Sequence, residues 1–208
     1  MRLQRLRATK LTDLRFNFHN LLPCDILHRM FSRATYGFGI FLWFTSWYLA
    51  GWSQELAPML VFRDTNGQEH KLSEYQGKVV VLNFWATWCV PCQHEMPMLA
   101  AAQKHYRDRG IVVIGASVDD EKTRENVGPF ATKYKISFPL MLNANTENMK
   151  ALGLGETIPA TAFVDKDGRV ASRVLGELSR SDLNHRIEWM LGNRRGKEPP
   201  ALVNNLGK

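Results

Sequence analysis

In this sequence, a segment with the pattern of a buried strand is closely followed by a pair of cysteines. Residues 78–85 (KVVVLNFW) form a nearly continuous run of apolar and β-branched residues, which is typical of a strand covered on both faces. Soon after it, Trp88-Cys89-Val90-Pro91-Cys92 opens a segment with helical periodicity that continues to Arg107. A strand covered on both faces and followed by a helix indicates an α/β fold.

Strand and helix patterns alternate along residues 53–192, which are predicted to form one domain. Short strand-like runs flank Asn66-Gly67 and Asp167-Gly168, so two hairpins are expected. Further elements are predicted by periodicity, with strands at 111–116 and 138–142 and helices at 123–134, 146–152 and 179–191. This order predicts a mixed central sheet flanked by helices. Residues 193–208, rich in Gly, Pro and Asn, are predicted to form a disordered tail.

Residues 34–52 contain no charged side chain. As a helix they would span about 28 Å, which is close to the hydrocarbon thickness of a bilayer. Seven basic residues precede this segment, whereas the next charge after it is Glu55. Because positive charge marks the cytoplasmic side, residues 1–33 are predicted to be cytoplasmic. The domain would then lie in the periplasm, held at the inner membrane by a single transmembrane anchor.

Alternatives to a retained anchor stay open. Small residues at Gly51 and Ser53 weakly match a cleavage site before Gln54, and cleavage there would release a soluble periplasmic protein. Met30 is a second possible start of the chain, and a chain that begins there would have an N-terminal segment more like a signal peptide. A buried core helix is a third interpretation, because glycine and hydroxyl residues lower the hydropathy of residues 34–52.

Charge and cysteine content exclude two further classes of protein. The formal net charge is +7, but residues 1–35 hold seven basic and only two acidic residues. The rest of the chain is therefore nearly neutral, and no nucleic acid is expected as a partner. Three cysteines are too few for a disulfide scaffold. Cys24 precedes the apolar segment and is expected to be a free thiol on the reducing side of the membrane.

The pair Cys89 and Cys92 indicates disulfide exchange. At a helix N-terminus, the first thiol faces free backbone N–H groups and the positive end of the helix dipole, and both favour the thiolate. Cys89 is therefore predicted to attack disulfides, and the more buried Cys92 to resolve the mixed disulfide. Pro91 fits the first helical turn, where its missing N–H costs nothing. Zinc would need two more ligands, so neither a metal nor another cofactor is expected.

Together these motifs resemble the thioredoxin superfamily, specifically its membrane-tethered, extracytoplasmic TlpA/ResA-type branch. The resemblance covers about residues 57–192 and rests on five motifs: LSEYQGKVVVLNFWATWCVPC, Glu95-Met96-Pro97, Ser117-Val118-Asp119, Ile158-Pro159-Ala160-Thr161 and FVDKDGRV. It implies a thioredoxin-like fold with an added N-terminal hairpin and a central insertion at residues 121–142.

The resemblance also implies roles for residues outside the cysteine pair. The peptide bond between Ile158 and Pro159 would be cis and lie beside the active disulfide. The Ile158 backbone could then pair with an extended substrate segment. From spacing alone, an ordinary proline at the start of a strand fits equally well. Trp88 and Pro91 are expected to shape the docking surface, whereas Trp85 is expected to pack in the core.

Glu95 lies one helical turn after Cys92, so the two residues share a helix face. A carboxylate there could relay a proton to or from the resolving thiol. Cytoplasmic thioredoxins carry a buried aspartate on the preceding strand, where this chain has Asn83, which cannot titrate. TlpA/ResA-type proteins resemble this chain in placing the acid on the helix. A solvated surface glutamate is the alternative.

The resemblance implies a thiol:disulfide oxidoreductase that reduces other proteins outside the cytoplasm. Its substrates would be protein disulfides, such as those of the haem-site cysteines of apocytochrome c. A membrane electron donor would reduce the Cys89–Cys92 pair again. The Val90-Pro91 dipeptide lacks the histidine of strongly oxidising relatives, which favours an electron-donating protein.

Two functions from other classes remain open. A thiol peroxidase on the same fold needs a threonine three residues before its reactive cysteine, but Ala86 stands there and Thr87 is one residue off. A non-enzymatic binding module would not depend on the cysteine pair.

Overall fold

The computed structural model describes residues 55–207 of the chain. The predicted cytoplasmic segment, the apolar segment 34–52 and Cys24 lie outside the described residues. No helix within residues 55–207 is long and apolar enough to cross a membrane.

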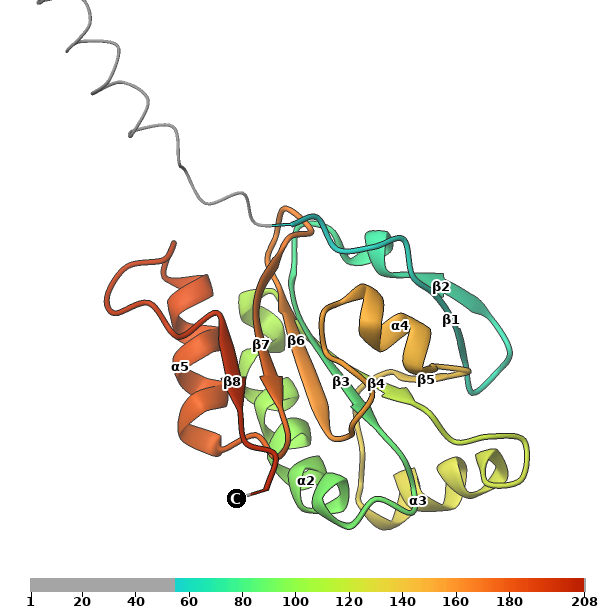
Figure 1. Cartoon of the computed structure of the whole chain (residues 1–208). Helices are drawn as coiled ribbons and strands as arrows, with labels where there is room; N and C mark the ends of the chain where they lie inside the picture. The colour runs from blue at the N-terminus through green and yellow to red at the C-terminus, as the bar shows by residue number, and fades with distance from the viewer. Residues whose placement is uncertain (1–54, 208) are drawn as a thin grey trace, which may run out of the picture. The chain divides into compact units, whose positions relative to one another are not determined.

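Within the described residues, eight strands form one mixed sheet in the order β2-β1-β5-β4-β3-β6-β7-β8 (Figure 1). The strands are β1 (Val61–Asp64), β2 (Glu69–Lys71), β3 (Val79–Trp85), β4 (Ile111–Ser117), β5 (Leu140–Leu142), β6 (Ala160–Val164), β7 (Val170–Leu175) and β8 (Leu202–Asn204). The α-helices are α2 (Val90–Tyr106), α3 (Val127–Lys133), α4 (Thr146–Ala151) and α5 (Arg180–Leu191).

The central strand β3 is buried along its whole length. It pairs in parallel with β4 and antiparallel with β6, so its backbone groups have partners on both sides. Alternate side chains point to opposite faces of the sheet. Val79, Val81 and Trp85 belong to one core cluster, whereas Val80, Leu82 and Phe84 belong to another. The predicted burial of this strand on both faces is confirmed.

Helices cover the two core clusters from opposite sides of the sheet (Figure 1). The cluster that contains Trp85 also takes in Met96 of α2, Phe130 of α3 and Leu183 of α5. The second cluster includes Met149 of α4. The expected thioredoxin-like arrangement, a mixed sheet flanked by helices, is therefore present in the described residues.

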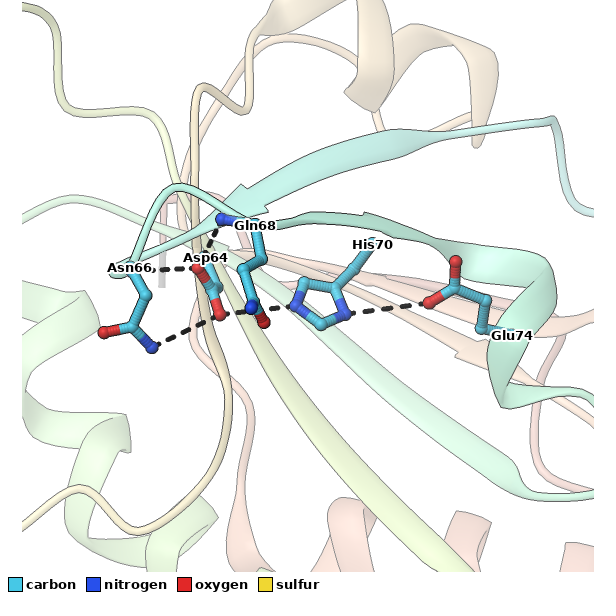
Figure 2. Close-up of polar contacts among 5 residues, drawn as sticks. All are labelled: Asp64, Asn66, Gln68, His70 and Glu74. Carbon is cyan, nitrogen blue, oxygen red and sulfur yellow. Dashed lines mark hydrogen bonds and ion pairs between the residues drawn. The ribbon is translucent and has the colours of Figure 1, made fainter.

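The expected N-terminal hairpin is formed by β1 and β2 (Figure 2). The Asp64 carboxylate accepts hydrogen bonds from the backbone N–H groups of Asn66 (2.8 Å) and Gln68 (2.9 Å) and closes the turn. His70 Nε2 lies 3.3 Å from Asp64 Oδ2, and its Nδ1 lies 3.6 Å from Glu74 Oε2. The hydrogen bonds that Asp64 accepts, above all the one from the Gln68 N–H, lower the pKa of Asp64.

Prolines shorten two of the predicted elements. The helix expected at residues 123–134 is a 3-10 turn at Arg124–Asn126 followed by α3, which places Pro129 in the first helical turn. The strand expected at 138–142 begins only at Leu140, because Pro139 has no N–H for the ladder. With β5 and α3, residues 121–142 connect β4 to α4, in the region of the expected central insertion.

The prediction of a disordered tail at residues 193–208 was wrong for its strand-forming part. Residues 202–204 form β8, which pairs in parallel with β7 at the edge of the sheet (Figure 1). Arg173 N donates to Ala201 O (2.8 Å), and the buried Arg186 guanidinium donates to Pro200 O (2.8 Å). A strand of three residues is too short to produce a recognisable periodicity, and its partners lie far away in the sequence.

Candidate active site

The cysteine pair lies where the central strand turns into α2. Cys89 is the N-cap residue of the helix, and Pro91 occupies its first turn. Cys89 and Cys92 form a disulfide with an S–S distance of 2.02 Å and a Cα–Cα distance of 5.2 Å. The Cys92 backbone N–H donates to Cys89 Sγ (3.3 Å). The first sulfur therefore faces the helix N-terminus, as the sequence predicts, and Cys92 is completely buried.

Trp88, which directly precedes Cys89, and Ile158 border one groove. The groove has a volume of about 620 Å³, and its wall also includes Val118 and Met149. Trp88 is 59% exposed, whereas Trp85 is fully buried with its ring 4.8 Å from that of Phe130. The two tryptophans therefore differ as predicted.

The peptide bond between Ile158 and Pro159 is cis, as the resemblance implied. Pro159 directly precedes β6, the antiparallel neighbour of β3. Its carbonyl accepts a hydrogen bond from Gly176 N (2.9 Å), so the loop after β7 is attached to this turn.

Glu95 is buried, with an exposed fraction of 1%. One carboxylate oxygen accepts a hydrogen bond from Asn83 Nδ2 (2.9 Å), and the other accepts one from the Leu178 backbone N–H. Asn83 also donates to Thr161 Oγ1 (3.0 Å). The alternative of a solvated surface glutamate is therefore excluded. Sequence analysis placed Asn83 beside the active site but missed Leu178, which is distant in sequence and acts through its backbone.

Burial raises the pKa of Glu95 to about 7. The hydrogen bonds from Leu178 and Asn83 oppose this shift because they stabilise the carboxylate, whereas the negative charge of Glu177 adds to it. A carboxyl group that is half-protonated near neutral pH can both donate and accept a proton. The site thus contains a cysteine pair and a buried acid on one helix face.

Asp119 fixes the loop that carries the cysteines, a role that sequence analysis did not assign. Its side chain is buried directly after β4. One carboxylate oxygen accepts from Thr87 Oγ1 (2.6 Å), and the other accepts from Thr87 N (2.9 Å) and Ser117 Oγ (2.7 Å). The available signal was an acid immediately after a buried strand that runs parallel to β3.

A second set of hydrogen bonds ties the same loop to α3. Gln93 Nε2 donates to the Thr87 carbonyl (3.0 Å), and the hydroxyl of Tyr134 donates to Gln93 Oε1 (2.9 Å). Tyr134 is the C-cap residue of α3. The insertion therefore contacts the cysteine loop through a polar chain that runs across α2.

Other titratable groups lie outside this centre. The side chain of His94 is exposed, as expected, with Nδ1 4.0 Å from Glu177 Oε1. Among residues 55–207, no group of three or more His, Cys, Asp or Glu residues is arranged to hold a metal ion.

Residues 54–173, more than half of the chain, match the family described as AhpC/TSA. The chain belongs to this family. Over 132 residues it is 35% identical to the thiol-disulfide oxidoreductase ResA of Geobacillus thermodenitrificans, a match that covers 64% of this chain and 74% of that relative. The ResA protein of Bacillus subtilis is 34% identical over 125 residues, or 60% of this chain and 68% of the relative.

Solved structures give the same assignment. A putative thiol:disulfide interchange protein DsbE from Chlorobium tepidum superposes with a TM-score of 0.61 at 25% identity, over 67% of this chain and 97% of that one. With the Cys89–Cys92 disulfide, these similarities identify the chain as a thiol-disulfide oxidoreductase of the ResA and DsbE type with a thioredoxin-like fold.

Proposed function

We propose that this oxidoreductase reduces disulfides of other proteins on the outer side of the cytoplasmic membrane. The observation that carries the proposal is the arrangement at the head of α2. A disulfide caps the helix, and a buried acid with a pKa near neutrality lies one turn behind it. Cys89 is the attacking thiol, Cys92 the resolving thiol and Glu95 the proton relay.

The reaction begins with the reduced pair. The Cys89 thiolate attacks one sulfur of the substrate disulfide, which breaks that bond, forms a mixed disulfide and releases one substrate thiolate. Cys92 then passes its proton to Glu95, and the resulting thiolate attacks the Cys89 sulfur. The Cys89–Cys92 disulfide forms and the second substrate thiolate leaves, taking up a proton. Two electrons have passed from the cysteine pair to the substrate.

Substitution of each cysteine tests these roles. Cys92→Ser should accumulate mixed disulfides with substrate proteins, because nothing resolves them, whereas Cys89→Ser should form none. Equal trapping by both variants, or full activity of Cys89→Ser, would contradict the assignment. Full activity of Cys89→Ser would instead support a binding module.

The direction of electron flow rests on the residues between the cysteines. Val90 and Pro91 supply no positive charge that would stabilise the reduced pair. We expect a reduction potential nearer the thioredoxin value of about −270 mV than the value of about −120 mV found in strong oxidants. A potential at the oxidising end, measured by equilibration with glutathione, would reverse the proposed direction.

Docking of the substrate would use the groove between Trp88 and Ile158. The exposed indole offers an apolar contact, and the backbone before Pro159 can add a strand of the partner protein. Apocytochrome c, with its haem-site cysteines, is the proposed substrate, and a membrane electron donor would restore the dithiol. Identification of the proteins trapped by Cys92→Ser tests both partners.

The peroxidase alternative has less support. Ala86, which stands where such an enzyme needs threonine, is buried, and the hydroxyl of Thr87 is engaged by Asp119. A coupled assay in which the protein fails to consume peroxide would exclude it.

A further inference from the structure

The loop between β7 and α5 touches the active site at two points. Gly176 N donates to the carbonyl of Pro159, and Leu178 N donates to the carboxylate of Glu95. Leu178 is itself buried. The position of residues 176–178 therefore decides whether Glu95 keeps its backbone hydrogen bond.

The C-terminal segment is hydrogen-bonded to this loop at two points. Asn205 N donates to the carbonyl of Leu175 (2.7 Å), and Asn205 Nδ2 donates to the carbonyl of Glu177 (2.9 Å). One residue thus fixes the chain both before and after Gly176.

Gly176 itself packs against the backbone of the C-terminal segment. A Cβ atom at this position would come within 2.8 Å of Asn205 C and 2.9 Å of Leu206 N. The φ angle of Gly176 is +83°, a region that other residues rarely adopt. The close approach therefore requires glycine, and it leaves the loop no room to move toward the segment.

The C-terminal segment is itself well anchored. It pairs with β7 through β8, and Arg186 donates to Pro200 O from within the core. The AhpC/TSA match ends at residue 173, so both the loop and the segment lie beyond it.

We propose that residues 201–206 are a positioning element of the active site, which holds the loop 175–178 so that the Leu178 N–H stays directed at the Glu95 carboxylate. Asn205 is its principal positioning residue. The proposal rests on the proposed function only for its catalytic consequence, because the hydrogen bond to Glu95 exists whatever the reaction.

The direction of the effect follows from the groups around Glu95. Its neighbours on β3 and β6, Asn83 and Thr161, do not titrate. Glu177 of the loop, which faces His94 of α2, is the charged neighbour. We expect Asn205→Ala to leave the buried Leu178 side chain in place, so that Glu95 stays out of water and burial, the largest cause of its raised pKa, is retained. Weakening the Leu178 hydrogen bond would then raise the pKa of Glu95, whereas moving the charge of Glu177 away would lower it. The hydrogen bond is the larger of these two influences, so the pKa should rise.

The test is a titration of Glu95 in the oxidised full-length protein by its infrared carboxyl band, identified by difference against Glu95→Gln. Wild type should titrate with a midpoint of about 7. Asn205→Ala should raise the midpoint by about half a unit. The matched control is Asn204→Ala, which removes only a bond inside the segment, from Leu206 N to Asn204 Oδ1.

The outcomes separate this proposal from the proposed function. An unchanged midpoint in Asn205→Ala overturns the positioning role. A shift as large in Asn204→Ala shows general loosening and overturns the role of Asn205. The proposed relay fails separately, if Glu95→Gln resolves mixed disulfides at the wild-type rate at every pH while the Asn205→Ala midpoint still shifts.

Discussion

Glu95 combines burial with a small number of directional hydrogen bonds. Removal from water favours the neutral acid, whereas the donors at Asn83 and Leu178 favour the carboxylate, and the balance leaves a group that titrates close to neutral pH. Because Asn83 cannot ionise, it adds no second charge beside Glu95, and Glu177 is the acid whose charge acts on it.

Glu95 should make the stability of the oxidised protein depend on pH. Its folded-state pKa of about 7 lies above the ordinary value of 4.5, so the folded chain binds this proton more tightly than the unfolded chain does. The stability it contributes is complete below pH 4.5 and is lost as the pH rises to about 7. Relative to Glu95→Gln, wild type should lose about 3 kcal/mol of unfolding free energy across this window.

Urea unfolding of both proteins at the two ends of the window measures this difference. Glu125→Gln, at an exposed glutamate of the 3-10 turn before α3, is the control and should follow wild type. Parallel pH profiles for wild type and Glu95→Gln would show that Glu95 titrates at its ordinary pKa.

The two thiols of the reduced protein should differ in reactivity. Both cysteines are buried in the oxidised protein, but Cys89 keeps 5% of its surface exposed and caps α2 next to the exposed Trp88, whereas Cys92 has none. Iodoacetamide should therefore label Cys89 well before Cys92, with peptide mapping at short reaction times as the measurement. Equal labelling rates would contradict the assignment of Cys89 as the attacking thiol.

The conformation of the loop before α2 depends on hydrogen bonds to Asp119, which lies outside the loop. Asp119→Ala would leave the part-buried N–H and hydroxyl of Thr87 and the buried hydroxyl of Ser117 without this acceptor. We expect a loss of about 2–3 kcal/mol in the free energy of unfolding, together with slower disulfide exchange, because Cys89 is only two residues away.

Chemical unfolding and exchange kinetics of Asp119→Ala measure both effects. Asp120→Ala is the matched control, because the exposed Asp120 accepts bonds only from its own turn, from Lys122 and Thr123. If Asp119→Ala were as stable and as active as this control, the hydrogen bonds of Asp119 would not be needed for either property.

For the whole chain, the proposed topology rests on charge and on the chemistry of the domain. A reductant of protein disulfides is most useful where disulfides otherwise persist, which agrees with a cytoplasmic basic N-terminus and an external catalytic domain. A reporter fused after Lys208 should therefore be active only if it works outside the cytoplasm. An N-terminal tag should remain with the membrane fraction if residues 34–52 are retained as an anchor.

Two results would change this picture in different ways. A soluble product that begins near Gln54 would replace the anchor by a cleaved signal but keep the compartment. A C-terminal reporter active only in the cytoplasm would contradict both the anchor orientation and the external location.

Local patterns in the sequence were sufficient for most of the secondary structure and for the cysteine pair. The hairpin at Asn66-Gly67, the buried strand at residues 79–85 and the helix that Cys89 caps all depend on neighbouring residues, so their signals are continuous in the chain. The position of Pro91 follows from the same local rule. The order of these elements was sufficient for the α/β class, because a strand covered on both faces needs helices.

Only the tertiary structure decided the environment of Glu95 and the conformation of the C-terminal segment. Helical spacing places Glu95 on the face of Cys92, but its burial depends on Leu178, 83 residues further along the chain. The strand β8 likewise exists because β7 offers an unpaired edge, a property of the assembled sheet and not of residues 202–204. Contacts between distant segments set the burial and hydrogen bonding of each group, and these in turn set the pKa of Glu95.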